Sequence, residues 1–188
     1  DVLISTRAFT HAQSQPTTVD GISGTYYSQR LWQALVRFLT NNGNDREAIE
    51  YLLQQRYGIT TIVPDYQALT ANTTNEAADR FQDFHNEELL NIINMFEEMP
   101  ADRHRLPDLR YLVRRLDATN HPLYENAPAV SWTARGYIEF MESAFYYQSI
   151  DYTKRLILHE KTHFLWDNHF DEAVKEDWAL VGDWSRLT

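Results

Sequence analysis

The sequence predicts an α+β fold in which a small sheet is enclosed by helices. Two patterns in the second half of the chain carry this prediction. Apolar residues recur at helical spacing over 86–98, and the helical pattern returns from Asp151 onward. Between these segments the pattern changes to a period of two, as is typical of strands, over 109–116, 129–132 and 137–141.

The first 84 residues predict a mostly helical region that includes two short strands. They are Val2-Leu3-Ile4, within a segment expected to be extended over 1–25, and the β-branched run Ile59–Val63, which Pro64 ends. Three helices are predicted in this region. The first covers 27–42, and the second begins after Asn44 or Asp45 as its cap and ends at Gly58. The third begins at Thr73 or Thr74 and passes through Phe81 and Phe84. We therefore divide the chain into a helical region of unassigned role, 1–84, and an α+β region, 85–188.

Composition excludes several classes of protein. The net charge of −10 argues against a nucleic-acid partner, because the phosphate backbone demands a basic surface. The absence of cysteine excludes disulfides and thiolate metal sites, and no apolar run approaches the length of a membrane span. The chain begins with Asp1 rather than methionine, which suggests a processed form or part of a longer chain. We expect an extracellular or cell-surface location rather than a cytoplasmic one.

One motif carries chemistry: His159-Glu160-Lys161-Thr162-His163. On a helix, histidines four residues apart lie on one face, one turn apart, so both imidazoles reach the same zinc ion. Glu160 projects beside that ion, where its carboxylate can take a proton from water and pass it to a leaving amine. The surrounding segment, 155–165, has no glycine or proline and is rich in apolar residues, which predicts a buried helix.

The motif His159-Glu160-x-x-His163 resembles that of the zincin zinc metallopeptidases, and the chain is most similar to the gluzincin or lethal-factor-like group of bacterial zincins. The resemblance covers about residues 86–170 and implies a zincin-like core of backing helix, small mixed sheet and active-site helix. It implies Zn²⁺ as cofactor, His159 and His163 as metal ligands, Glu160 as the catalytic base, and a peptide or protein as substrate. It also implies an edge strand along the cleft, which we assign to 136–140. Lys161 departs from the zincin pattern, and we expect its long stem to reach solvent.

A third zinc ligand is needed, because catalytic zinc usually has three protein ligands and one open position. His169 has the metzincin spacing but lacks the glycine that turns the chain. Glu172 and Glu176 lie closer to the motif than the gluzincin glutamate usually does, and Asp183 is better spaced if the chain folds back. We expect the third ligand to lie beyond Thr188, with the core truncated at its C-terminal end.

Two alternatives to a peptidase remain open at this stage. One is a non-catalytic zincin-like domain that serves as a structural or protein-interaction module of a larger protein. The other is a helical interaction protein in which the motif arose by chance. Glu139 and Glu142 are predicted to flank the cleft, where they would favour basic substrates.

Overall fold

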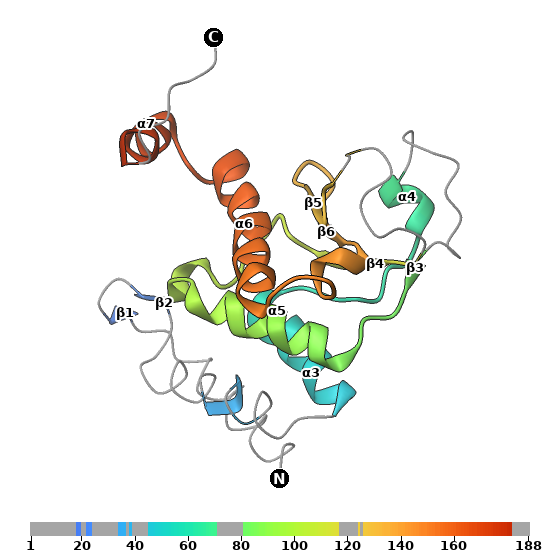
Figure 1. Ribbon diagram of the computed structural model, residues 1–188. Helices are drawn as coiled ribbons and strands as arrows, with labels where there is room; N and C mark the ends of the chain where they lie inside the picture. The colour runs from blue at the N-terminus through green and yellow to red at the C-terminus, as the bar shows by residue number, and fades with distance from the viewer. Residues whose placement is uncertain are drawn as a thin grey trace.

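The computed structural model has an α+β fold, with a small mixed sheet on one side of a group of packed helices (Figure 1). The residues it describes are 18–19, 22–23, 34–36, 38, 45–70, 81–116, 124 and 126–181. Within this part of the chain, none of the helices combines the length and the apolar character that crossing a membrane requires.

The sheet has four strands in the order β3-β4-β6-β5. They are β3 (Phe81–Gln82), β4 (Tyr111–Arg115), β5 (Ala129–Trp132) and β6 (Tyr137–Phe140). β4 and β6 run parallel, whereas β3 and β5 pair antiparallel to their neighbours. A separate two-stranded ladder joins β1 (Thr18–Val19) to β2 (Ile22–Ser23). β5 is therefore an edge strand of the four-stranded sheet.

The helices are α3 (Arg46–Leu52), α4 (Tyr66–Thr70), α5 (Asn86–Glu98), α6 (Ile150–Asn168) and α7 (Glu172–Val181). A π-helical turn, Leu53–Tyr57, continues α3, and short 3-10 turns span Ala101–Arg103 and Glu142–Ala144. α5 contacts α3 and α6, and α6 also contacts β5 (Figure 1). This arrangement fixes α6 between a backing helix and the edge of the sheet.

The main hydrophobic core joins α3, α5 and α6 to one side of the sheet, and a second, smaller cluster holds Leu69, Phe81, Val113 and Tyr137. The main core includes Ile49 and Leu52 from α3, Ile92 and Phe96 from α5, and Phe164 from α6, all of which are buried. The predicted division at residue 84 stays a prediction, although helices on both sides of that position share this core.

Several predicted elements are confirmed. The segment 86–98 is α5, although its N-cap is His85 rather than Asn86, and the three period-two runs contain β4, β5 and β6. In the second predicted helix, the Asp45 carboxylate accepts a hydrogen bond from Ala48 N (3.3 Å). Gly58 ends that segment in the left-handed region (φ 72°) that glycine favours.

Two predicted elements in the first half are wrong. Phe81 lies in β3 rather than in a helix, because it pairs with Arg115 of β4 and completes the sheet. The predicted strand Ile59–Val63 is reduced to a single parallel bridge between Thr60 and Tyr111. Of the predicted helix over 27–42, the described residues 34–36 and 38 are helical. The predicted strand Val2-Leu3-Ile4 and the predicted helix start at Thr73 or Thr74 lie outside the described residues.

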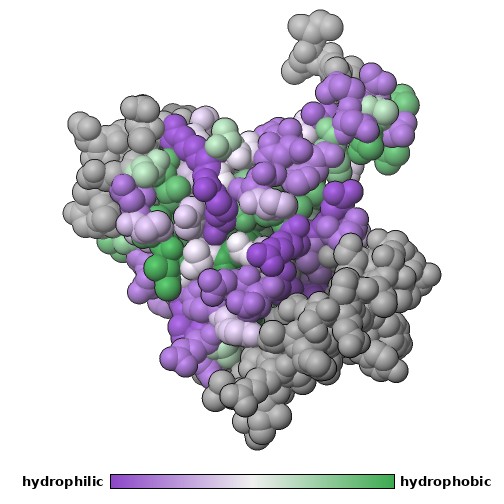
Figure 2. Space-filling model, turned by 180° about the vertical axis from the view of Figure 1, so that it is seen from behind, coloured by the Kyte–Doolittle hydropathy of each residue, from purple (hydrophilic) through white to green (hydrophobic). Residues whose placement is uncertain are grey.

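α7 projects from the body of the protein and has no buried residue (Figure 1). Figure 2 shows apolar side chains on this projecting helix, and its exposed apolar residues are Val174, Trp178, Leu180 and Val181. Its Trp178 ring lies 5.9 Å between centroids from Phe170, which follows α6, and Lys175 Nζ lies 5.8 Å from the Trp166 ring of α6. α7 thus adds little to the core that positions α6.

Candidate metal centre

The motif lies in the middle of α6, a 19-residue helix. Ser149 caps this helix, because its hydroxyl accepts a hydrogen bond from Tyr152 N (3.3 Å). Ile157 and Phe164 anchor the helix in the core with no exposed surface. These two anchors fix the rotation of the helix about its axis, so that His159 and His163 are accessible to solvent and Glu160 is buried.

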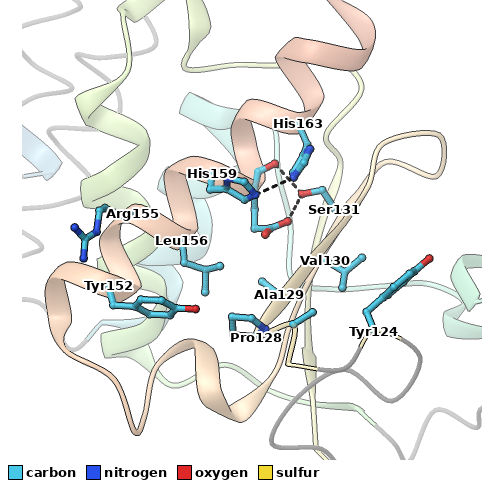
Figure 3. A pocket seen from close by; sticks show the side chains of 12 residues that line it. Tyr124, Pro128, Ala129, Val130, Ser131, Tyr152, Arg155, Leu156, His159 and His163 are labelled. Atoms are coloured by element: carbon cyan, nitrogen blue, oxygen red, sulfur yellow. Dashed lines mark hydrogen bonds between the residues drawn. The ribbon is translucent and has the colours of Figure 1, made fainter. Parts of the chain in front are cut away.

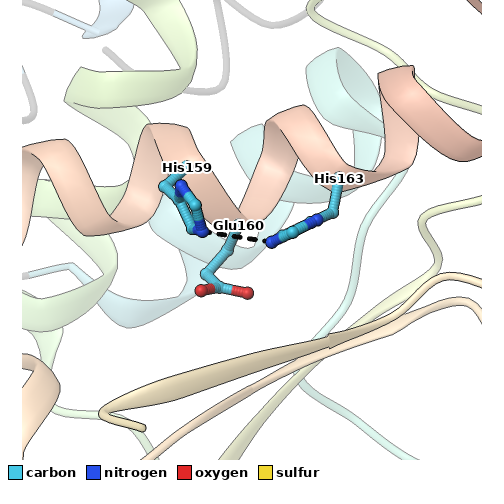
Figure 4. A group of neighbouring side chains, drawn as sticks. All are labelled: His159, Glu160 and His163. Carbon is cyan, nitrogen blue, oxygen red and sulfur yellow. Dashed lines mark hydrogen bonds between the residues drawn. The ribbon is translucent and has the colours of Figure 1, made fainter. Parts of the chain in front are cut away.

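His159 and His163 face each other across one helical turn (Figure 4). Their Nε2 atoms lie 3.1 Å apart, and their ring centroids 4.7 Å apart. Two nitrogens bound to one tetrahedral zinc at ordinary Zn–N lengths lie about 3.3 Å from each other. The separation of the two Nε2 atoms is therefore close to that of two ligands of one zinc ion.

Glu160 is 4% exposed, and its carboxylate contacts Ser131 of β5. Its Oε2 atom accepts a hydrogen bond from the Ser131 hydroxyl at 2.7 Å (Figure 3). The ligand atoms of His159, Glu160 and His163 all lie within 4.8 Å of one another. A carboxylate thus stands beside the point at which the two imidazoles converge, where it can exchange a proton with water.

A cleft of about 860 Å³ opens over this group (Figure 3). One wall is residues 127–131, which lead into and form most of β5, and the other is the face of α6 that carries Tyr152, Leu156 and the motif. This cleft is within the size range of ligand sites. The strand that borders the cleft, β5, is thus an edge strand of the four-stranded sheet.

The predicted edge strand is the wrong one. The segment 136–140 contains β6, which is paired on both sides, to β4 and to β5. Residues of β6 are buried throughout, because they lie in the middle of the sheet. The edge strand that borders the cleft is β5, and the antiparallel hairpin that follows it returns the chain into β6.

Glu139 and Glu142 do not flank the cleft. The Glu139 carboxylate is buried against Arg115 (2.7 Å), and Trp132 Nε1 also donates to it (3.0 Å). Glu142 accepts a hydrogen bond from Arg114 (2.7 Å) of β4, a strand that β6 separates from β5. Both carboxylates form ion pairs with arginines of the sheet, so they do not support the predicted preference for basic substrates.

Lys161 does not reach solvent, contrary to the sequence expectation. Its side chain is fully buried, and its ammonium group donates to the carbonyl of His104 (2.8 Å) and lies 4.0 Å from the centre of the Phe96 ring. Burial lowers the pKa of Lys161 to about 7. The helix turns this residue toward α5, because its neighbours in the motif occupy the open face.

The candidate third ligands within the described residues do not join the two imidazoles. His169 ends α6, and its Nε2 lies 2.8 Å from a carboxylate oxygen of Asp108. Glu172 and Glu176 are exposed on α7. Asp183 lies outside the described residues. The third ligand therefore stays a prediction, to be sought in Asp183 or beyond Thr188.

Sequence reasoning missed Ser131, the residue of β5 that contacts Glu160. A lone serine in a short strand has no distinctive spacing. The available signal was the alternation of 129–132, which places Ala129 and Ser131 on one face of the strand. Assigning that face to α6 requires the sheet order, and the sequence does not state it.

No family model, no curated protein and no solved structure matches this chain. The geometry of the site is therefore the basis for a functional assignment.

Proposed function

We propose that this protein is a zinc-dependent metallopeptidase, with His159 and His163 as zinc ligands and Glu160 as the general base. The observation that carries the proposal is the 3.1 Å separation of the two Nε2 atoms, beside a buried carboxylate at the floor of an open cleft. A zinc ion held there would lower the pKa of water and polarise a carbonyl group. The donor set also fits, since neutral imidazole is a common zinc ligand.

Glu160 has the role of moving protons in this mechanism. Its carboxylate accepts a proton from the attacking water and delivers it to the amine that leaves when the peptide bond breaks. Burial keeps the carboxylate away from bulk water, and the Ser131 hydroxyl limits its rotation. Removing this group should lower turnover by about 100-fold or more.

A peptide substrate is favoured by the edge strand. β5 is paired to β6 on one side only, and residues 127–131 line the cleft on the other side. An extended peptide can add to such an edge through main-chain hydrogen bonds. This would hold the scissile bond over the motif, so we assign the substrate-pairing role to β5 in place of the segment 136–140.

Elemental analysis tests the metal site. The 188-residue chain, purified without chelator, should hold close to one zinc per molecule, and His159→Ala should lose it. His169→Ala is the matched control, because this histidine lies on the same helix but pairs with Asp108. Zinc retained by His159→Ala, or absent from the unaltered chain and from any longer form of it, would contradict the proposal.

Cleavage of fluorescently labelled casein tests the chemistry. Glu160→Gln should abolish zinc-dependent cleavage while zinc content is unchanged, because the amide cannot accept the proton. Asp167→Asn removes an exposed carboxylate two turns along the same helix and should leave the rate unchanged. Equal activity of Glu160→Gln and the unaltered chain would show that the assigned base is wrong.

A non-catalytic zincin-like module is the second candidate function. The observation in its favour is that, within the described part of the chain, the grouping consists of His159, Glu160 and His163, without a further ligand. Such a module would bind zinc through the two histidines but would not hydrolyse casein. The two measurements above therefore separate the candidates.

A further inference from the structure

Ser131 connects the edge strand to the proposed base. Its Oγ lies 2.7 Å from Glu160 Oε2 and 2.7 Å from the backbone oxygen of the same residue. We propose that Ser131 is a positioning residue that holds the Glu160 carboxylate beside the two imidazoles, an inference that rests on the proposed peptidase function. It acts through Glu160 and does not itself touch the reacting atoms.

The carboxylate is the better acceptor of the single serine proton. Within α6 the backbone oxygen of Glu160 is already the acceptor for the N–H four residues later, as in any α-helix. A hydrogen bond to an ionised group is also about twice as strong as one between neutral groups. Because Ser131 Oγ is equally distant from both oxygens, its proton goes to the stronger acceptor, Oε2 of Glu160. This hydrogen bond selects one rotamer of the Glu160 side chain, which has three rotatable bonds.

The strand that carries Ser131 is itself firmly placed. Ser131 pairs in register with Ile138 of β6, a residue with no exposed surface. Two residues further along, the Thr133 hydroxyl donates to the Asp167 carboxylate (2.6 Å), which ties the end of the same strand to α6. Thr133 and Ser131 thus make the same kind of bond to one helix, but only Ser131 bonds to the proposed base.

This pairing supplies a matched control. Ser131→Ala should lower kcat for zinc-dependent casein cleavage by about 10- to 100-fold, because a misplaced base loses its alignment with the attacking water. KM and zinc content should stay within about twofold, since neither depends on the carboxylate. Thr133→Val, which removes the other tether, should leave kcat within about twofold. Ser131→Thr keeps the hydroxyl and should restore most of the rate.

A spectroscopic measurement decides the contact independently of activity. In protein labelled at the glutamate side-chain carboxyl carbon, the Glu160 signal is the one that Glu160→Gln removes. Ser131→Ala should shift this signal at constant pH, whereas Thr133→Val should not. An unchanged signal, or an equal fall in kcat in Thr133→Val, would overturn the positioning role.

If the unaltered chain does not cleave casein, the peptidase proposal and the catalytic part of this inference fail together. A shifted signal in Ser131→Ala would still identify the Ser131–Glu160 bond.

Discussion

The two faces of α6 differ in what their polar residues do. On the open face, His159 and His163 are accessible to solvent and contact each other. On the opposite face, Lys161 is buried against Phe96 and bonded to the His104 carbonyl. A single five-residue motif thus contributes both to the candidate metal centre and to the core. The difference teaches that polar side chains in a motif need not share a role.

The buried face continues into a polar network of Arg56, Tyr57, Glu97, His104 and Lys161. Glu97 receives hydrogen bonds from the Arg56 guanidinium (Nε, 2.9 Å) and the Tyr57 hydroxyl (2.7 Å). Burial acts to raise the pKa of Glu97, but the bonded Arg56 outweighs it and holds that pKa below its ordinary value. Burial lowers the pKa of His104, which favours the neutral ring. The polar groups of this network pair mainly with one another inside the fold, although His104 Nδ1 has no hydrogen-bond partner among the described residues. The imidazoles of the open face instead border the cleft, with their Nε2 atoms 3.1 Å apart.

If the buried face supports the fold, truncating its core residue should have the largest effect. Phe164→Ala should lower the free energy of unfolding by about 4 kcal/mol, because it leaves a cavity beneath α6. Urea denaturation measures this value. Leu180→Ala is the control, since Leu180 is 78% exposed on α7, and its change should stay within about 0.5 kcal/mol. Equal losses in both variants would show that α6 does not depend on this face.

Removing the charge of Glu97 should have the next largest effect. Glu97→Gln should cost about 3 kcal/mol of unfolding free energy, because the buried Arg56 guanidinium loses its ion pair with Glu97. Glu98→Gln makes the same change at the exposed neighbouring position and should have little effect. The same urea series measures both. A neutral result for Glu97→Gln would mean that solvent reaches Arg56 and that the network is not sealed.

The sequence predicted the candidate site better than it predicted its surroundings. Helical spacing was enough to bring His159 and His163 together, because the contact is local to one turn. The edge strand was assigned wrongly, because β5 and β6 have similar local patterns and only the parallel pairing of β6 with β4 makes β6 internal. Long-range pairing of this kind is not encoded in a single segment.

The predicted environment of Lys161 was wrong for a related reason. A lysine is usually solvated, and nothing in its immediate neighbours indicates the carbonyl and aromatic rings that receive it. Those partners, His104 and Phe96, come from segments more than 50 residues earlier in the chain. His104 is itself buried for the same reason. Fold class and local motif geometry were thus accessible, whereas contacts between distant segments were not.

Lys161→Met should have a smaller effect and the opposite sign. The folded protein holds the pKa of Lys161 at about 7, below the ordinary value of 10.5, so between these values the unfolded chain binds more protons. The stability contribution of this lysine therefore rises with pH across that window. At pH 7, Lys161→Met should be more stable than the unaltered protein by about 1 kcal/mol, and this difference should fall by up to about 1.4 kcal/mol per pH unit, so that it reverses before pH 10. Urea denaturation at several pH values checks this. A gain that is independent of pH would mean that the lysine is charged in the fold throughout.

Changes on the open face should have the smallest effect on the fold itself. In the presence of a chelator, His163→Ala should change the free energy of unfolding by less than about 0.5 kcal/mol, because its ring is accessible to solvent and its ring contact among the described residues is with His159. With zinc added at 100 times its dissociation constant, the unaltered protein should gain about 2.7 kcal/mol, since a ligand that binds only the folded state stabilises it. His163→Ala should lose that gain.

If His163→Ala unfolds in the absence of zinc, His163 belongs to the core and the contrast between the two faces of α6 is lost. Zinc stabilisation that survives the change would instead locate the metal elsewhere, while intact stability combined with lost zinc response would confine metal binding to the open face of α6.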